Sequence, residues 1–544
     1  MSAGPGLRVA LLGGLLLGFA TPPALVPFGE WLVLPALACW FAIAIGSKRP
    51  ALHSYLFGCA HMAWFSWSIR HVMVGAYLAI VFVGGLYYLA ASACVRGAPR
   101  RLREVAFALA VAGSFWLRAV MPEICYPHGQ PCHSLYEWPT LIRCVTVGGE
   151  PLMNGLLALV SACAVGVWSS WRAANPAWGA AWRRLLLAVG AFCGCAFAGN
   201  LLLAAASGEG VPRAVDVVAI EPGFRPEPLA ELPLAELRDY LARFEEERLR
   251  DPTRAALAGG PALVLWPESS VGAVIDAARI GRGGARLRPG IAPVAEGQLL
   301  LGAAVREASA AGSTPAAILV DLSDGRVQGY QAKQRLVPGG EFVPFLSLLP
   351  ESWASWVREQ FRASLGSLPQ SAAGGVRPPL ETTAGVPFGA LLCYDNAFYG
   401  PAAAQVEQGA EFLVVLSNEG WYRGGAELQQ LVAMTVVRAC ENAVPIVRCT
   451  MDGWTVAVDA AGELQQGLPL DHEIAEGRPR ALSVPVQRGL GKPPAMRWLR
   501  RSTGWISGIA LAIGLLGALL ARRRRAGGRS GPEQAGGSAA PTGR

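Results

Sequence analysis

The chain has 544 residues, of which 52% are hydrophobic and only 16% are charged, and its mean hydropathy is +0.35. This composition is too apolar for an ordinary soluble protein of that length and indicates a membrane protein with two or three domains. The net charge of +8 comes largely from arginine clusters in short segments between apolar runs, which is the pattern of membrane topology signals. The more polar part shows no basic face with interleaved aromatic residues, so nucleic acid is not indicated as a partner.

Seven apolar runs precede residue 208, and each is a candidate transmembrane helix. The first run lacks a convincing small-residue cleavage site, and further apolar spans follow it, so we expect it to remain as a span rather than a cleaved signal. The runs lie at about 7–21, 30–46, 51–68, 74–95, 104–121, 152–168 and 185–206.

Basic residues follow the second, fourth and sixth runs, so the positive-inside rule places those exits in the cytoplasm. An eighth run, 504–521, then returns the chain to the cytoplasmic side. The sequence therefore predicts a polytopic helical bundle of about eight spans, built from 1–207 and 504–521, with both termini inside. Residues 522–544 begin with four arginines and become rich in Gly, Ser and Pro, which predicts a basic, disordered cytoplasmic tail.

Residues 213–490 have ordinary globular composition and fall outside the membrane by the same count. Strand-like apolar runs alternate there with helical patterns, which is typical of an α/β domain with sheet and helix layers. We expect helices at 229–249, 401–409 and 426–442. We expect strands at 214–220, 262–266, 298–304, 316–322, 386–392, 412–416, 446–448 and 454–458.

Three residues in this domain follow apolar runs or precede a tight turn. Cys393 ends a buried strand and is positioned to act as a nucleophile, because α/β sheets place ligands at the carboxyl ends of their strands. Glu268 follows an apolar run and a proline, where a carboxylate is suited to general base work. Lys333 precedes Glu341 by eight residues across a Pro-Gly-Gly turn. Its charge could stabilise an oxyanion and lower the pKa of a nearby thiol to give a thiolate.

Each of these residues, taken alone, has a plainer structural explanation: a packing cysteine, a turn glutamate or a solvated lysine. Together, in the order Glu, Lys, Cys, they resemble the triad of the carbon–nitrogen hydrolase (nitrilase) superfamily. The resemblance implies a four-layer α-β-β-α sandwich. It also implies that Glu268 is the base, Lys333 the oxyanion stabiliser, Cys393 the nucleophile and Glu341 a supporting glutamate.

The flanking membrane spans narrow this to a resemblance to apolipoprotein N-acyltransferases, which covers nearly the whole chain. The stretches that carry it are Trp266-Pro267-Glu268, Lys333 with Leu336-Val337-Pro338 and Gly340-Glu341, Cys393-Tyr394, and Ser417-Asn418-Glu419-Gly420-Trp421-Tyr422. That family moves an acyl chain from a glycerophospholipid to the α-amino group of the S-diacylglyceryl cysteine of a lipoprotein.

The resemblance implies a multi-pass enzyme of the bacterial inner membrane with its catalytic domain on the periplasmic face. Its partners would be a phospholipid acyl donor and a diacylglyceryl-modified lipoprotein acceptor, and no cofactor or metal is expected. Cys393 would carry the acyl chain as a thioester in a ping-pong mechanism. The backbone N–H of Tyr394 is a candidate oxyanion donor, and Asp395 and Trp421 are further supporting residues.

Several positions depart from the family pattern and leave the acyl donor and acceptor open. Asp395 stands where the family usually has glutamate, and Gly339 where it usually has phenylalanine. Glu221 begins the segment where Gln-x-Asn is usual, and Met451 replaces an asparagine. Transfer to another amine, or hydrolysis by a membrane-tethered amidase, remains an alternative, and a non-catalytic binding protein is a weaker one.

The predicted external loop 122–150 contains Cys125, His128, Cys132 and His133. A Cys125–Cys132 disulfide and a metal site are both conceivable in an oxidising compartment, but an incidental pair is the default. The cysteines inside the predicted spans are expected to be packing residues; these are Cys39, Cys59, Cys94, Cys163, Cys193 and Cys195.

Overall fold

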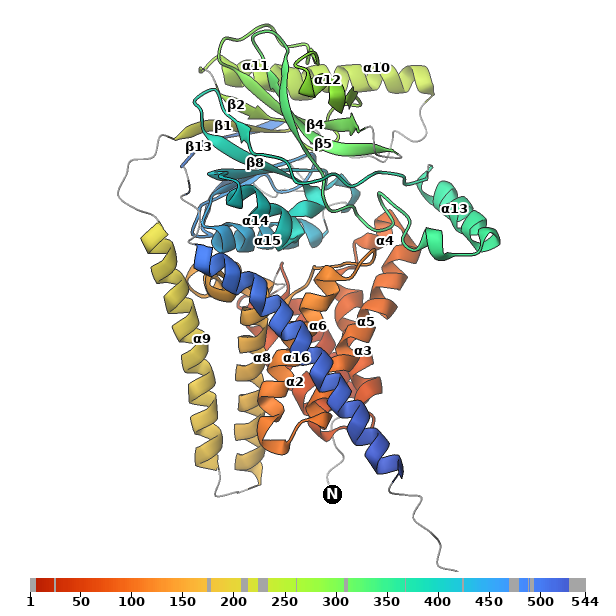
Figure 1. The fold of residues 1–544 in the computed structure, drawn as a ribbon, viewed down its shortest axis with the longest axis vertical. Helices are drawn as coiled ribbons and strands as arrows, with labels where there is room; N and C mark the ends of the chain where they lie inside the picture. The colour runs from red at the N-terminus through yellow and green to blue at the C-terminus, as the bar shows by residue number, and fades with distance from the viewer. Residues whose placement is uncertain are drawn as a thin grey trace, which may run out of the picture.

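A computed structural model shows a bundle of long helices on one side and an α/β domain on the other (Figure 1). It describes residues 6–23, 26–173, 178–206, 214–223, 233–260, 262–307, 312–366, 368–422, 425–468, 479–487, 489 and 494–527. The long helices α8, α9 and α16 extend away from the α/β domain, so their far ends mark the opposite side of the molecule (Figure 1).

Eight helices of the described part coincide with the eight predicted apolar runs. Five segments are long and apolar enough to cross a membrane: 29–46, which contains α2, and the helices α5, α8, α9 and α16. The helices α1 and α3 are shorter, and α6 contains three charged residues. A count of about eight spans therefore remains a prediction. The bounds are α1 Leu7–Ala20, α2 Val33–Gly46, α3 Pro50–Phe65, α5 Val74–Gly97, α6 Arg103–Val120, α8 Val145–Arg172, α9 Trp178–Ala206 and α16 Pro494–Gly527.

The last helix differs from the predicted span at both ends. It begins ten residues before the predicted 504 and continues to Gly527, past the four arginines that were expected to open a disordered tail at 522. Arginine has high helix propensity, so a helix already formed in the span continues through such a run. The rest of the predicted tail, 528–544, lies outside the described residues. Close packing ties α16 to the bundle, because a Cβ added at Gly113 of α6 would meet the Ser507 carbonyl oxygen at 2.5 Å.

The α/β domain contains two mixed sheets. The strand order is β13-β1-β2-β4-β5-β6, with β3 beside β4, in the first sheet and β12-β11-β10-β9-β8-β7 in the second. The first-sheet bounds are β1 Val215–Glu221, β2 Leu263–Leu265, β3 Val274–Asp276, β4 Gln298–Arg306, β5 Ser313–Asp321, β6 Val327–Ala332 and β13 Arg480–Val486. The second-sheet bounds are β7 Leu380–Glu381, β8 Pro387–Leu392, β9 Phe412–Ser417, β10 Ile446–Thr450, β11 Val456–Val458 and β12 Leu464–Gly467.

All eight predicted strands are present, and five further strands were not predicted: β3, β6, β7, β12 and β13. These strands are short, lie near sheet edges or contain polar residues, so they lack a strong apolar signal. The whole of β12, for example, is exposed. The predicted helix at 229–249 is α10 Leu234–Glu245 followed by a π-helical turn to Arg250, and residues 224–232 lie outside the described part.

The two sheets pack face to face and form the central core of the domain. Leu265 and Leu300 of the first sheet belong to one apolar cluster with Phe388 and Val414 of the second. The helices α10 and α11 (Asp251–Leu257) cover the outer face of the first sheet, where Phe244 contributes to a second cluster. The helices α14 (Tyr399–Glu407) and α15 (Glu427–Asn442) cover the second sheet (Figure 1). These layers form the α-β-β-α sandwich that the resemblance implied.

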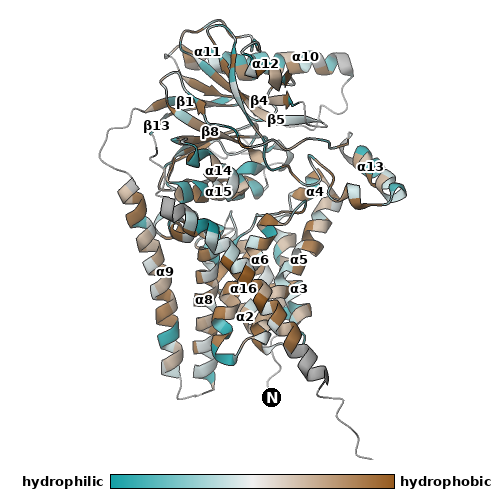
Figure 2. Cartoon of the chain, viewed as in Figure 1, coloured by the Kyte–Doolittle hydropathy of each residue, from teal (hydrophilic) through white to brown (hydrophobic). Residues whose placement is uncertain are grey.

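The helix α15 connects the sandwich to the bundle. All residues from Glu427 to Asn442 are buried except Gln429, which is partly exposed, although most surface helices expose a polar face. One apolar cluster includes Val432 and Val436 of α15 together with Phe65 and Met153 of the bundle. Hydrophobic residues dominate the bundle, whereas the sandwich has a mixed surface (Figure 2). The second sheet therefore faces the membrane part across a buried helix.

Candidate active site

Cys393 lies at the point where β8 ends. A 3₁₀ turn, Cys393–Ala397, follows Leu392 directly, as the sequence predicted. The backbone φ of Cys393 is +43°, in the left-handed region. A non-glycine residue held in that region stores about 1–3 kcal/mol of strain and is typical of functional sites. The strand and the strained turn together fix the position of a half-buried thiol.

Lys333 follows β6 and is almost fully buried, with 1% of its surface exposed. Its ammonium group donates to Glu268 Oε1 at 2.8 Å and to Glu341 Oε1 at 2.8 Å. Each carboxylate is fixed by a second bond: Glu341 Oε2 accepts the Val337 N–H at 2.8 Å, and Glu268 Oε2 accepts the Asn418 N–H at 3.2 Å. The predicted base, cation and supporting glutamate therefore form one buried cluster.

The Cys393 thiol lies within electrostatic range of this cluster. Burial and the charge of Glu268 raise the pKa of Cys393 to about 12, although the charge of Lys333 opposes the shift. The prediction that Lys333 lowers the pKa of the thiol is confirmed in direction. Its effect has the expected sign, but burial and two carboxylates outweigh it, so the resting group is a neutral thiol.

The charge state of Lys333 follows from the same contacts. Burial alone would lower the pKa of the ammonium group, but Glu268 and Glu341 raise it well above its usual value. The site therefore keeps a permanent cation beside a neutral thiol. This arrangement can stabilise negative charge that develops on a substrate oxygen.

Asp395 joins the two segments that carry the lysine and the cysteine. Its carboxylate accepts N–H bonds from Arg335 at 2.7 Å, Gln334 at 3.1 Å and Leu392 at 3.3 Å. Burial raises the pKa of Asp395 to about 7, although Lys333 and these N–H groups oppose the shift. Asp395, although shorter than the usual glutamate, therefore holds the backbone of both segments through these hydrogen bonds.

Tyr394 connects the catalytic turn to the bundle. Its hydroxyl donates to the Cys125 carbonyl at 2.7 Å, and its ring lies 5.8 Å from that of His128, nearly parallel to it. Both partners belong to the loop 122–150 that the sequence placed outside the membrane. Trp421, the other predicted supporting residue, lies in a 3₁₀ turn, Gly420–Tyr422, with 50% of its surface exposed.

Asn418 contacts the site, although the sequence analysis assigned Ser417 and Asn418 no role beyond their place in a motif. Ser417 ends β9 and Asn418 follows it, and β9 pairs parallel to β8 with Leu416 opposite Leu392. Neighbouring parallel strands end at the same edge, so the residues after β8 and after β9 must meet there. The predicted positions of these two apolar runs would have been enough to identify both residues.

The remaining departures from the family pattern have structural roles. Gly339 has a φ of +80° in the turn before Glu341 and donates its N–H to the Phe342 carbonyl at 2.8 Å. A phenylalanine could not take that backbone conformation without strain. Glu221 is buried and accepts from Arg480 at 3.0 Å, and Met451 belongs to the apolar cluster of the first sheet.

The loop 122–150 contains no Cys125–Cys132 disulfide, since both residues are free thiols. Cys132, His133 and Glu150 have possible ligand atoms within 4.8 Å of one another. The guanidinium of Arg438 lies 2.7 Å from Glu150 Oε1 and would repel a cation. His133 Nε2 also lies 2.8 Å from that oxygen, so the group is better described as a buried polar network between α8 and α15 than as a metal site.

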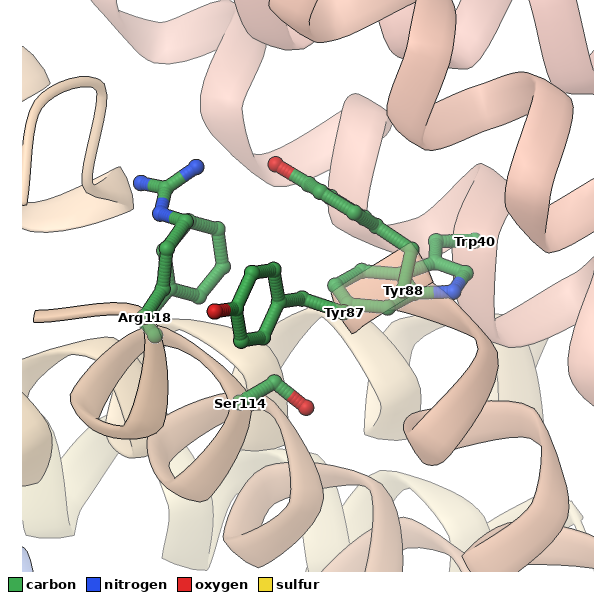
Figure 3. A pocket seen from close by; sticks show the side chains of 6 residues that line it. Trp40, Tyr87, Tyr88, Ser114 and Arg118 are labelled. Carbon is green, nitrogen blue, oxygen red and sulfur yellow. The ribbon is translucent and has the colours of Figure 1, made fainter. Parts of the chain in front are cut away.

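A narrow gap too small to hold a water molecule lies inside the bundle. Trp40, Tyr87, Tyr88, Ser114 and Phe115 line it with Arg118 (Figure 3). The Arg118 guanidinium donates to the His128 carbonyl and lies 4.7 Å from the Phe115 ring centroid. Because His128 stacks on Tyr394, this arginine supports the loop beneath the catalytic turn.

Two family models match the chain. The apolipoprotein N-acyltransferase N-terminal domain matches residues 13–163, and the carbon–nitrogen hydrolase domain matches residues 252–478. An apolipoprotein N-acyltransferase from Gloeobacter violaceus is 28% identical over 487 residues, which is 84% of each chain. One from Sinorhizobium medicae is 24% identical over 495 residues, which cover 84% of this chain and 86% of the relative.

The chain is a divergent homologue of the apolipoprotein N-acyltransferases. Among solved structures, an amidase of the nitrilase superfamily from Nesterenkonia AN1 is 20% identical, with a TM-score of 0.30 over 54% of this chain and 95% of that chain. Within the family layout, the first matched domain contains α2 to α6 and most of α8, and the second contains Glu268, Lys333 and Cys393.

Proposed function

We propose that this protein transfers an acyl chain from a glycerophospholipid to the α-amino group of a lipoprotein's S-diacylglyceryl cysteine, with Cys393 as the acyl carrier. The main support is the buried cluster in which one ammonium group contacts two glutamates at 2.8 Å beside a thiol on a strained turn. The family relationship supplies the reaction class. The helix bundle supplies access to substrates that are anchored in lipid.

In the first half-reaction Glu268 accepts the thiol proton as the sulfur of Cys393 attacks the ester carbonyl of the donor. A neutral resting thiol makes this proton transfer necessary. The ammonium group of Lys333 and the backbone N–H of Tyr394 stabilise the oxyanion. The intermediate then expels the lysophospholipid oxygen, which takes the proton back from Glu268 and leaves a thioester.

In the second half-reaction the acceptor amine attacks the thioester carbonyl. Glu268 accepts a proton from the amine, the oxyanion returns to the same donors, and the Cys393 sulfur leaves and is reprotonated. The amide product is an N-acylated lipoprotein. Water could enter at the same step, so exclusion of water from the acyl-enzyme is what separates transfer from hydrolysis.

We also propose that the catalytic domain lies on the periplasmic face of the inner membrane. The arginine-rich segments after the second, fourth and sixth apolar runs support this orientation through the positive-inside rule. The far ends of α8, α9 and α16 extend away from the sandwich, which is consistent with both termini on the cytoplasmic side (Figure 1).

The experiment is mass spectrometry of lipoprotein N-termini in cells that depend on this protein for N-acylation. The wild-type chain is expected to give N-acylated cysteine, and Cys393→Ala to give only the diacylglyceryl form, with activity below about a thousandth of wild type. Cys193→Ser is the matched control, because Cys193 is exposed on α9. Unchanged N-acylation with Cys393→Ala would overturn the proposal. Release of free fatty acid without N-acyl product would instead indicate a hydrolase.

A further inference from the structure

Two cysteines outside the catalytic site lie against each other at the junction of the bundle and the sandwich. Cys144 precedes α8 by one residue, and Cys195 lies in the second half of α9. The two residues are free thiols in the structure, but their Sγ atoms are 3.0 Å apart, although 51 positions separate them in sequence. A bonded pair is about 2.05 Å apart, so the sulfurs lie only about 1 Å beyond bonding distance.

The backbone of α9 lies in close contact with the segment before α8 next to this pair. A Cβ added at Gly199 of α9 would meet the Arg143 carbonyl oxygen at 1.9 Å, so only glycine permits this approach. One residue further, the Asn200 amide donates to the Thr140 carbonyl at 2.9 Å and accepts from the Arg143 side chain at 2.8 Å. Cys195 is one helical turn before Gly199, so the same face of α9 presents its thiol to Cys144.

The pair lies on the side of the bundle that meets the sandwich. Arg143, the neighbour of Cys144, donates to the Ala461 carbonyl at 2.9 Å and forms an ion pair with Glu463 at 2.5 Å. Both partners belong to the catalytic domain. In the orientation proposed above this side faces the periplasm, where disulfides form and persist, although Cys195 itself belongs to the apolar segment 178–205 that is long enough to cross a membrane.

We propose that Cys144 and Cys195 form a disulfide that ties α9 to the segment before α8. The inference rests on the proposed orientation, because a cytoplasmic site would keep both thiols reduced. The chemistry is thiol–disulfide exchange with a disulfide-carrying oxidoreductase. One thiolate attacks the donor disulfide, the second displaces the donor from the mixed disulfide, and two S–H bonds are exchanged for one S–S bond while the donor leaves as a dithiol.

The location gives this bond a structural role. Most of α9 faces away from the rest of the bundle, with Leu186, Leu187, Phe197 and Leu201 exposed on its surface. The helix stands at one side of the bundle beside α8, and the chain passes from it into β1 (Figure 1). A covalent link in its second half would hold α9 against the segment before α8 when the lipid-facing surface is perturbed.

The test uses the full-length protein purified from membranes of a host with an oxidising periplasm. Free thiols are blocked with a maleimide under denaturing conditions before any reduction, and the peptides are mapped by mass spectrometry. The expected result is a linked peptide pair containing Cys144 and Cys195, with alkylation of either residue only after dithiothreitol. Alkylation of both residues before reduction in most molecules would overturn the proposal.

Variants distinguish this pair from nearby thiols and from the catalytic function. Cys195→Ser is expected to leave Cys144 open to maleimide, whereas Cys193→Ser, two residues away, is expected to leave the linked peptide intact. Lipoprotein N-acylation is measured in the same preparations. Loss of N-acylation by wild type with the linked peptide present would contradict the proposed function alone, and free thiols with normal N-acylation would contradict the disulfide alone.

Discussion

At the scale of single residues, the site combines a permanent cation with a thiol that is neutral at rest. Lys333 is held by two carboxylates, and Cys393 has a pKa raised to about 12 by burial and by Glu268. In the proposed mechanism Glu268 must therefore accept the thiol proton as the sulfur attacks, because Cys393 is protonated at rest. The two members of the buried ion pair therefore differ in what their removal should do.

Glu268→Gln is expected to lower the acyl-enzyme formation rate by about a hundredfold to ten-thousandfold while leaving the fold intact, because the amide oxygen can still accept the Asn418 N–H. Lys333→Ala is expected to lose activity and also about 3–5 kcal/mol of stability, because it leaves the buried Glu268 and the half-buried Glu341 without a counterion. Thermal unfolding and labelled-phospholipid transfer, measured side by side, check both. Equal stability of the two variants would contradict the account.

Asp395 gives a pH dependence whose sign can be stated. Its folded pKa of about 7 is above its ordinary value of 3.8, so folding favours the protonated form. The stability that this contributes is complete below about pH 4 and is lost as the pH rises through 7. Relative to Asp395→Asn, which does not titrate, the wild-type protein is expected to lose thermal stability between pH 4 and pH 7. Parallel stability profiles for the two proteins would refute this assignment.

At the scale of elements, the buried strands and the long helices could be predicted from sequence, but the connections between them could not. The strands β8 and β9 are continuous apolar runs. Glu268 and Cys393 each follow such a run, so their positions at strand ends could be predicted from the sequence. The strand β6, which positions Lys333, contains Gln328 and Gln331 and gives no clear period. The hydrogen bonds of Asp395 to Gln334 and Arg335 depend on strand pairing, which a single sequence does not encode locally.

The helix α15 shows how buried ion pairs contribute to stability. Arg438 is fully buried and lies 2.7 Å from Glu150 of α8 and 3.2 Å from Glu441 of its own helix. We expect Arg438→Met to destabilise the protein by about 3–5 kcal/mol, because two buried carboxylates lose their partner. The control is Arg358→Met on the helix Glu351–Leu365, where the pair with Glu351 is exposed and is worth at most about 1 kcal/mol. Thermal unfolding in detergent should separate the two, and similar losses would count against the buried network.

At the scale of the whole molecule, the sandwich and the bundle share one apolar core through α15. A fragment spanning residues 214–487 would expose the bundle-facing side of that helix to water. We expect this fragment to aggregate or to elute with detergent micelles, while the full chain in detergent elutes as a discrete species. Size-exclusion chromatography with and without detergent is the measurement. A soluble, monomeric fragment would contradict the shared core.

The close packing of α16 against α6 has a consequence for biosynthesis. Among the described helices of the bundle, α16 comes last in the sequence, and it packs where Gly113 meets Ser507. A ribosome that stalls before residue 494 would therefore release a chain in which the faces of α5, α6 and α8 that α16 covers are left open.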